Sequence, residues 1–249
     1  MVRKLAPKKQ EYMEKEIPIP SVTPKSIKID QLRNIEPLTP GQEELFKKYT
    51  SGKNIVAHGF PGTGKTFLVM YLAFREILLR ESNYDKVVVV RSAIPVIDQG
   101  HLPGDISEKE LIFQMPYHAI FKELFNFPAS KIVSQLIHQG LYEFISTSYI
   151  RGVTINNAIV IVDEFENLDG HSLDSIITRC GSDCKIIFCG DKAQSDLKTN
   201  SDRNGMPKFL NILNSLDEFG HVEFGVDDIV RSSLVKNYII KKSELSIEF

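Results

Sequence analysis

The eight residues from Gly59 to Thr66 have the spacing G-x-x-x-x-G-K-[ST], which is typical of a loop that holds nucleotide phosphates. Its glycines let backbone N–H groups converge on anionic oxygens, because no Cβ stands in the way. Lys65 supplies an ammonium for the β- and γ-phosphates, and the Thr66 hydroxyl suits Mg²⁺. We expect every residue of the loop to contribute to a nucleotide site: Gly59, Phe60, Pro61, Gly62, Thr63, Gly64, Lys65 and Thr66.

Two more groups of candidate residues follow apolar runs. Asp163 and Glu164 come directly after the run at 158–162, which is the pattern of a Walker B strand. In that pattern Asp163 holds Mg²⁺ through its water shell, and Glu164 polarises the attacking water. The run at 185–189 leads to Gln194, which we expect to sense the γ-phosphate.

Three other polar side chains have both a functional and a structural interpretation. Gln42 offers a donor and an acceptor that suit the adenine N6/N7 edge, but it also fits an ordinary surface helix. Arg91 fits contact with phosphate or nucleic acid, or an ion pair with an acid such as Asp98 or Asp105. Arg231 fits charge stabilisation on a transferring phosphoryl group, or a salt bridge at a helix end.

The elements that must position these side chains alternate between strand and helix. A helix is expected to begin at Pro40 with Thr39 as its cap, because Pro is favoured at the first helical position. Continuous β-branched runs indicate strands that are buried on both faces of a parallel sheet. Strands are expected at 54–58, 86–91, 143–150, 158–162 and 185–189, and further helices at 65–80 and over most of 108–140. We therefore predict an α/β fold, with a mainly parallel sheet and helices on both faces.

Composition sets wider limits. The 249 residues suffice for one large domain or two small ones, with 42% hydrophobic and 25% charged residues. The net charge of −2 and the pI near 6.3 give no general argument for nucleic-acid binding, so such binding would need a local patch. The sequence has neither an apolar run of about 18 residues nor a signal-peptide core. We therefore expect no membrane partner and a cytoplasmic location.

Along the chain we expect three segments. Residues 1–30 are a basic arm that contains proline, 31–240 are the main domain, and 241–249 are a C-terminal tail. The arm fits either a solvated tail or a contact with nucleic acid or another subunit. The cysteines are interpreted as buried or incidental thiols, because their spacing matches no zinc ribbon: Cys180, Cys184 and Cys189.

Taken in order, the motifs resemble those of the PhoH-like proteins over roughly residues 38–240. The resemblance is carried by Gly59–Thr66, Arg91, Leu102–Asp105, Tyr149–Gly152, Asp163–Glu164, Gly190–Asp191 with Gln194, and Asp228–Arg231. It implies a RecA-like P-loop NTPase fold, similar to the first domain of superfamily-one helicases. It also implies ATP and Mg²⁺ as cofactors and a link to RNA, and it supports the roles of Gln42 and Gln194.

Two details qualify the resemblance. The segment Val-Arg-Ser-Ala-Ile-Pro at 90–95 looks like that of the versions found in large tailed bacteriophages, which implies the host cytoplasm. Glu166 stands where the family more often has Gln. A Gln side chain can donate an N–H to phosphate, whereas a carboxylate cannot.

From these observations we expect an ATPase that acts on RNA or single-stranded DNA, helicase activity included, with Arg91 and Arg151 as nucleic-acid contacts. ATP is favoured because no guanine-reading Asn-Lys-x-Asp segment occurs. The alternative is a nucleotide-gated oligomeric binding or assembly module with slow hydrolysis and no unwinding. A small-molecule kinase is a weaker interpretation, since no Arg-rich lid segment is evident.

We also expect self-association. A processive helicase of this superfamily uses two RecA-like domains with nucleotide between them, and the motifs here mark one. The expected assembly is a ring-like homo-oligomer, a hexamer, in which Arg231 acts in trans on the nucleotide of the neighbouring subunit.

Overall fold

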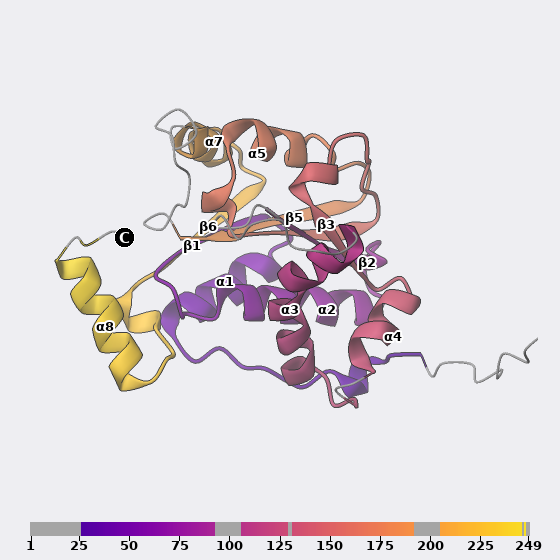
Figure 1. Cartoon of the computed structure of the whole chain (residues 1–249), viewed down its shortest axis with the longest axis horizontal. Coiled ribbons are helices and arrows are strands. Elements are labelled where there is room, and N and C mark those ends of the chain that lie inside the picture. Colours follow the sequence, from indigo (N-terminus) through magenta and orange to yellow (C-terminus); the bar gives the residue numbers. More distant parts are fainter. Residues whose placement is uncertain (1–25, 93–105, 129–130, 192–204, 246, 248–249) are drawn as a thin grey trace, which may run out of the picture.

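The computed structural model describes residues 26–92, 106–128, 131–191, 205–245 and 247. Its centre is a six-stranded sheet in the order β3-β2-β4-β5-β1-β6, and every neighbouring pair is parallel (Figure 1). The strands are β1 (Asn54–Gly59), β2 (Lys86–Arg91), β3 (Tyr142–Ser146), β4 (Ala158–Asp163), β5 (Cys184–Gly190) and β6 (Phe219–Phe224). The sheet confirms the predicted α/β class of RecA-like P-loop NTPases.

Helices cover both faces of this sheet, as predicted (Figure 1). One face carries α1 (Pro40–Thr50), α2 (Lys65–Leu79), α3 (Ile106–Leu124) and α4 (Ile132–His138), and the other carries α5 (Gly170–Ile177) and α7 (Gly205–Asn214). Alternate side chains of β4 enter the two cores: Ile159 and Ile161 on the first face, Val160 and Val162 on the second. A strand buried on both faces therefore has no polar alternation, which explains the apolar runs in the sequence.

Strand order brings the candidate residues to one edge. β5 lies between β1, which leads into the Gly59–Thr66 loop, and β4, which ends in Asp163. Because all the strands are parallel, their carboxyl ends lie at the same edge, where open α/β sheets bind ligands.

The start of α1 agrees with the predicted cap. The Thr39 side chain accepts a hydrogen bond from Gln42 N–H, and Pro40 is the first helical residue. Asp228, in the short 3₁₀ helix η4 (Val226–Asp228), accepts from Gly41 N–H over 2.8 Å and from Gly225 N–H over 2.8 Å. These bonds hold the segment after β6 against the start of α1.

The predicted strand at 143–150 is wrong at its end. β3 stops at Ser146 and continues as the 3₁₀ helix η2 (Thr147–Tyr149). The Ser146 hydroxyl accepts from Ser148 N–H, and a Ser side chain that bonds its own backbone competes with a strand ladder. Tyr149, whose aromatic ring favours strands, therefore lies in a turn at the sheet edge and is 50% exposed.

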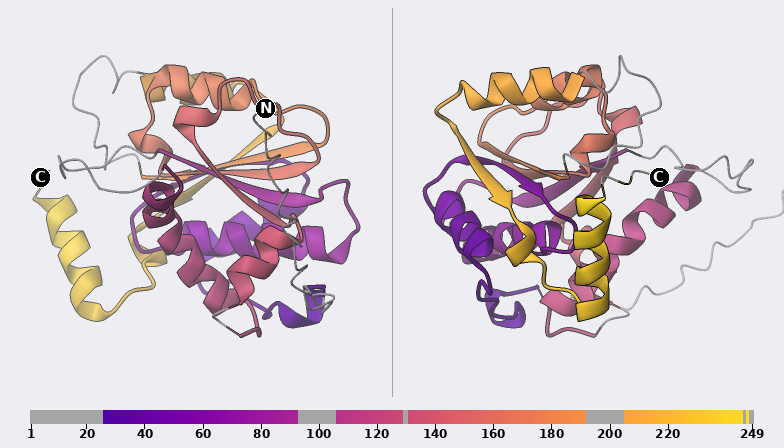
Figure 2. Two further views of the ribbon diagram at one scale, coloured as in Figure 1. Left: turned by 45° about the vertical axis from the view of Figure 1, so that its right-hand side comes forward. Right: turned by 90° about the vertical axis from the view of Figure 1, so that its left-hand side faces the viewer.

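The ends of the described chain differ from the expected segments. Ile27, assigned to the arm, is buried, and its N–H donates to Gln139 Oε1 over 2.9 Å. The last helix, α8 (Ser233–Glu244), passes the expected boundary at 240 and has no buried residue. Figure 2 shows it standing beside the rest of the domain. No helix within the described ranges is long and apolar enough to span a membrane.

Candidate functional site

The loop between β1 and α2 takes its shape from its glycines and from β6. Gly62 has a φ of 74°, a left-handed conformation that residues with a Cβ rarely adopt. At Gly59, an added Cβ would stand 2.2 Å from the Phe224 carbonyl oxygen, which also accepts from Phe60 N–H over 3.0 Å. β6 therefore fixes the loop in front of the N-terminus of α2, where amides and the helix dipole favour anions.

The Lys65 ammonium lies inside this loop. Its Nζ donates to the carbonyl oxygens of Gly59 over 3.0 Å and of Phe60 over 2.7 Å. Burial lowers the pKa of Lys65, and the carboxylates of Asp191 and Asp163 act in the opposite direction. A cation is thus held where β1, β4 and β5 end.

Asp163 lies at the end of β4 and is nearly buried. Its Oδ1 accepts from the Thr66 hydroxyl over 2.8 Å, and its Oδ2 accepts from the Tyr117 hydroxyl over 2.9 Å. Burial raises the pKa of Asp163, while these two hydrogen bonds lower it. Mg²⁺ prefers hydroxyl, carboxylate and water oxygens, so the adjacent Thr66 and Asp163 oxygens fit the predicted metal site.

Tyr117 is a part of this arrangement that the sequence does not reveal. It is fully buried on α3, and no local motif marks it. Its contact with Asp163 spans 46 positions of the chain, and only the packing of α3 on the sheet brings the two together.

Glu164 forms an ion pair with Arg91. The distance between Arg91 Nη2 and Glu164 Oε2 is 2.5 Å, and the two side chains are 18% and 41% exposed. Of the two interpretations of Arg91, the ion pair is therefore present, with the candidate catalytic base as its partner. Asp98 and Asp105, the acids named from the sequence, lie outside the described residues.

Glu166 lies deeper in the site than Glu164. A Cβ added at Gly190 would stand 2.0 Å from Glu166 Oε2, so the carboxyl group lies directly over that glycine. Burial raises the pKa of Glu166 to about 8, while hydrogen bonds from the backbone amides of Glu166 and Asp191 oppose the shift. This carboxyl group is therefore mostly protonated at neutral pH.

Gln42 is buried beside the loop, and both ends of its amide contact backbone. Nε2 donates to the Thr63 carbonyl oxygen over 3.0 Å, and Oε1 accepts from Leu38 N–H over 2.7 Å. One amide hydrogen and one lone pair remain. The adenine contact of Gln42 stays a prediction, but a second role in fixing the loop is directly visible.

Arg231 lies on the phosphate loop of its own chain. Val230 N–H donates to the Gly62 carbonyl oxygen over 3.1 Å, and a Cβ added at Gly62 would stand 2.7 Å from Arg231 Cγ. Arg231 thus contacts the loop of its own chain, and its expected action in trans stays a prediction. Arg151, by contrast, is exposed in the turn after β3, apart from the residues that line this pocket. Gln194 lies outside the described residues.

The candidate residues line one pocket of about 640 Å³, a volume suited to a nucleotide. The predicted residues in its wall are Gln42, Pro61, Gly62, Thr63, Gly64, Lys65, Thr66, Asp163, Glu164 and Arg231. Gly59 and Phe60, the first two residues of the loop, are not in the wall of the pocket, and their carbonyl oxygens accept hydrogen bonds from Lys65 Nζ.

Comparison with known proteins identifies the family of the chain. The family described as "PhoH-like protein" matches residues 34–242. The chain belongs to the PhoH-like family. A PhoH-like protein of Synechocystis is 33% identical over 182 residues, which cover 73% of this chain and 54% of that relative. Protein PhoH of Escherichia coli is 30% identical over 196 residues, covering 78% and 54%.

The PhoH-like chain is thus shorter than these relatives, and it spans little more than half the length of the curated proteins it matches. Among solved structures, it is similar to the large terminase of a thermophilic bacteriophage in complex with ADP, with 13% identity, a TM-score of 0.47 and coverage of 81% and 49%. It is also similar to a Bacteroides Pif1 helicase in complex with ADP-AlF3 and single-stranded DNA, with 15% identity, a TM-score of 0.41 and coverage of 85% and 49%.

Proposed function

We propose that this PhoH-like protein binds and hydrolyses ATP and couples the reaction to RNA or single-stranded DNA. The observation that carries the proposal is the convergence of Lys65, the Thr66–Asp163 hydrogen bond and Glu164 in one pocket. Lys65 and Thr66 begin α2, whereas Asp163 and Glu164 stand at the end of β4, and together they have the chemistry that phosphoryl transfer to water needs.

In this mechanism the loop amides and Lys65 bind the phosphate oxygens. Thr66 and Asp163 would hold Mg²⁺, which would supply neutralisation of the phosphate charge. Glu164 takes a proton from the attacking water as general base. Arg231 stabilises charge on the transferring group, and Gln194 senses the γ-phosphate.

The nucleic-acid part of the proposal rests on the sheet edge beside the pocket. Arg91 ends β2, and its register partner on β3 is Ser146, which leads directly into the turn with Tyr149 and Arg151. An exposed aromatic ring next to guanidinium groups suits single-stranded nucleic acid, since bases stack on the ring and phosphates pair with the cations.

A second candidate function is a nucleotide-gated homo-oligomer, a hexameric ring, in which slow hydrolysis resets assembly. The observation that favours it is α8, which has no buried residue and begins directly after Arg231 and Ser232. Stimulation of the ATPase by single-stranded RNA, together with strand separation on a tailed duplex, distinguishes the first function from the second.

The first experiment compares ATP binding and turnover in two variants. Lys65→Ala should weaken binding of a fluorescent ATP analogue and abolish hydrolysis. Glu164→Gln should retain binding and lose about two or more decades of kcat, the usual scale for general-base assistance. Glu218→Gln, an exposed acid before β6, is the control and should keep wild-type rates. Normal turnover by Glu164→Gln would show that another residue is the base.

A further inference from the structure

The ion pair between Arg91 and Glu164 joins the ends of two neighbouring strands. β2 and β4 are paired in register up to Val90 and Val162, so Arg91 and Glu164 lie close together where the two strands end. The Arg91 side chain is 18% exposed, whereas the Glu164 side chain is 41% exposed and lines the nucleotide pocket. The pair therefore lies between the pocket and the β3 side of the sheet.

The backbone at Glu164 is strained. Its φ of 50° and ψ of 46° place it in the left-handed region, which residues other than glycine seldom adopt without a compensating interaction. The contact with Arg91 is such an interaction, since it holds the side chain at a fixed place. Strain of this kind is concentrated at switch regions and active sites.

The ion pair restrains the position of the Glu164 carboxylate. A general base must lie within hydrogen-bond reach of the water that it deprotonates, and Glu164 Oε2 is instead held 2.5 Å from Arg91 Nη2. The pocket thus contains a candidate base whose reactivity depends on what else binds Arg91.

We infer that Arg91 is a positioning residue that restrains Glu164, and that a phosphate group of single-stranded nucleic acid takes over the guanidinium and releases Glu164 for catalysis. The inference rests on the proposed ATPase function and adds the route by which nucleic acid controls it. The guanidinium fork matches a phosphate as well as a carboxylate, so one anion can replace the other.

The surroundings of Arg91 explain why a polynucleotide is the competing anion. On the side away from the pocket, the edge strand β3 and its turn form a hollow. It is lined by Glu143, Phe144, Ile145, Ser146, Tyr149 and Val153, and the Glu143 carboxylate is paired with Lys86. Tyr149 presents half of its surface for base stacking, and Arg151 is exposed in the same turn. A single-stranded nucleic acid whose bases stack there would extend its phosphates along the sheet edge towards Arg91.

The test measures kcat and KM for ATP on the full chain, with and without a 20-residue oligouridylate or oligothymidylate. Arg91→Gln should raise the kcat without oligonucleotide by at least about threefold, part of the usual range of general-base assistance. Its KM for ATP should stay within about twofold of wild type, and oligonucleotide should add no further rate. Lys53→Gln is the control, because it removes an exposed cation at the amino end of β1, away from the pocket and the hollow, and it should behave as wild type.

Arg91→Lys keeps the positive charge but lacks the two-pronged guanidinium group. Its kcat without oligonucleotide should therefore stay low, and oligonucleotide should stimulate it less than wild type. If Arg91→Gln does not fold, Arg91→Lys becomes the decisive variant. Stimulation of its ATPase by oligonucleotide to the same extent as in wild type would then overturn the inference. A folded Arg91→Gln enzyme with a wild-type or lower unstimulated rate overturns it, as does a wild type that neither oligonucleotide stimulates. Stimulation by either supports it, and the stronger one identifies the preferred sugar. Failure of the ATPase proposal can be told apart from failure of this inference, because wild type would then hydrolyse no more ATP than Lys65→Ala.

Discussion

Glu166 shows how burial changes what one side chain can do. The family resemblance favours Gln at this position, and an ionised Glu could not donate a hydrogen bond to phosphate. Because burial raises the pKa of Glu166 to about 8, the group is a neutral carboxylic acid at neutral pH and retains one O–H donor. At neutral pH this chain therefore keeps the donor that the substitution would otherwise remove.

The same pKa predicts a pH dependence of stability. Between pH 4.5 and about 8, folded Glu166 holds a proton that the unfolded chain has released. Its contribution to stability is therefore fully present below pH 4.5 and is lost as the pH rises through about 8. Glu166→Gln cannot ionise, so its melting temperature should exceed that of wild type by about 4 °C or more at pH 9, and the difference should shrink towards pH 5.

Thermal unfolding followed by circular dichroism at pH 5, 7 and 9, without Mg²⁺ or nucleotide, checks this prediction. The exposed Glu218→Gln is the control, and its difference from wild type should not change with pH. Identical melting curves of Glu166→Gln and wild type at pH 9 would contradict a buried neutral Glu166.

At the residue scale, sequence predicts the chemistry that is local and misses the contacts that are not. Lys65 and Thr66 could be assigned because the loop and the helix start fix their positions relative to each other. The contacts of Asp163 with Tyr117 and of Glu164 with Arg91 join distant segments. The order of strands in the sheet decides which strand ends become neighbours, and the spacing of motifs along the sequence does not predict that order.

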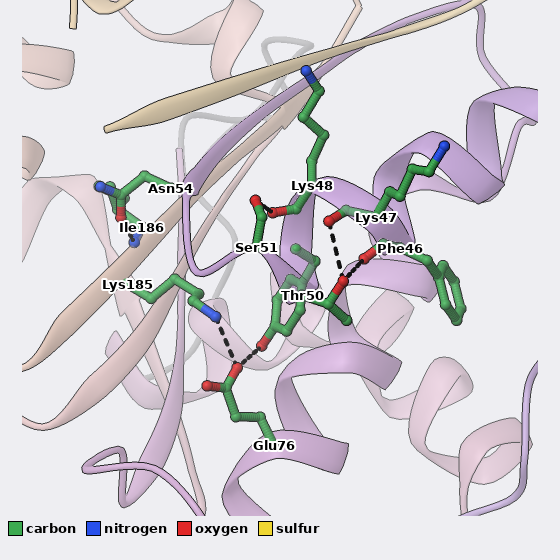
Figure 3. Close-up of polar contacts among 10 residues, drawn as sticks. Phe46, Lys47, Lys48, Thr50, Ser51, Asn54, Glu76, Lys185 and Ile186 are labelled. Carbon is green, nitrogen blue, oxygen red and sulfur yellow. Dashed lines mark hydrogen bonds and ion pairs between the residues drawn. The ribbon is translucent and has the colours of Figure 1, made fainter. Parts of the chain in front are cut away.

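At the scale of elements, a buried polar cluster fixes α1 and α2 to the start of β5 (Figure 3). Glu76 Oε2 accepts from Lys185 Nζ over 2.9 Å and from the Tyr49 hydroxyl over 2.5 Å. Lys185 Nζ also lies 4.0 Å from the centre of the Tyr49 ring, a cation–π contact. This cluster lies at the amino ends of the strands, opposite the nucleotide pocket, and its role is structural.

Breaking this cluster on one side should be costly. Lys185 is 5% exposed, so Glu76→Ala leaves a buried ammonium without its carboxylate and should lower the free energy of unfolding by about 3 kcal/mol or more. The double variant Glu76→Leu with Lys185→Met removes both charges and should lose less. Urea unfolding measures both, and Glu244→Ala, which breaks an exposed ion pair with Lys241, is the control at about 0.5 kcal/mol or less. A loss below about 1 kcal/mol for Glu76→Ala would contradict the prediction.

Element prediction succeeded where burial is complete and failed at an edge. β1, β4 and β5 are buried on both faces, so their apolar runs match the observed strands closely. β3 lies at the edge of the sheet, where one side lacks a neighbouring strand. Its end is decided by Ser146 and the turn rather than by residue propensity, and the prediction extended it by four residues, to Ile150.

At the scale of the whole molecule, α8 is an α-helix of the described chain that has no buried residue (Figures 1 and 2). Leu234, Tyr238 and Leu245 are 79%, 58% and 65% exposed. Together with Lys241 they recur at a spacing of 4, 3 and 4 residues, which is that of a coiled-coil seam. A helix of 12 residues is marginal alone, so an apolar seam of this kind favours a partner surface.

In the proposed homo-oligomer, we expect this seam to pack on a second copy of the chain. Leu234→Glu with Tyr238→Glu places two charges in the seam and should weaken self-association by at least tenfold, about 1.4 kcal/mol or more. Sedimentation equilibrium with and without ATP measures it, and Ser243→Glu, about 160° from the seam on the helix, is the control. Arg231 lies on the phosphate loop two residues before α8, so nucleotide should shift the self-association equilibrium of the wild-type protein. A wild type that stays monomeric with and without ATP would contradict a role for α8 in assembly.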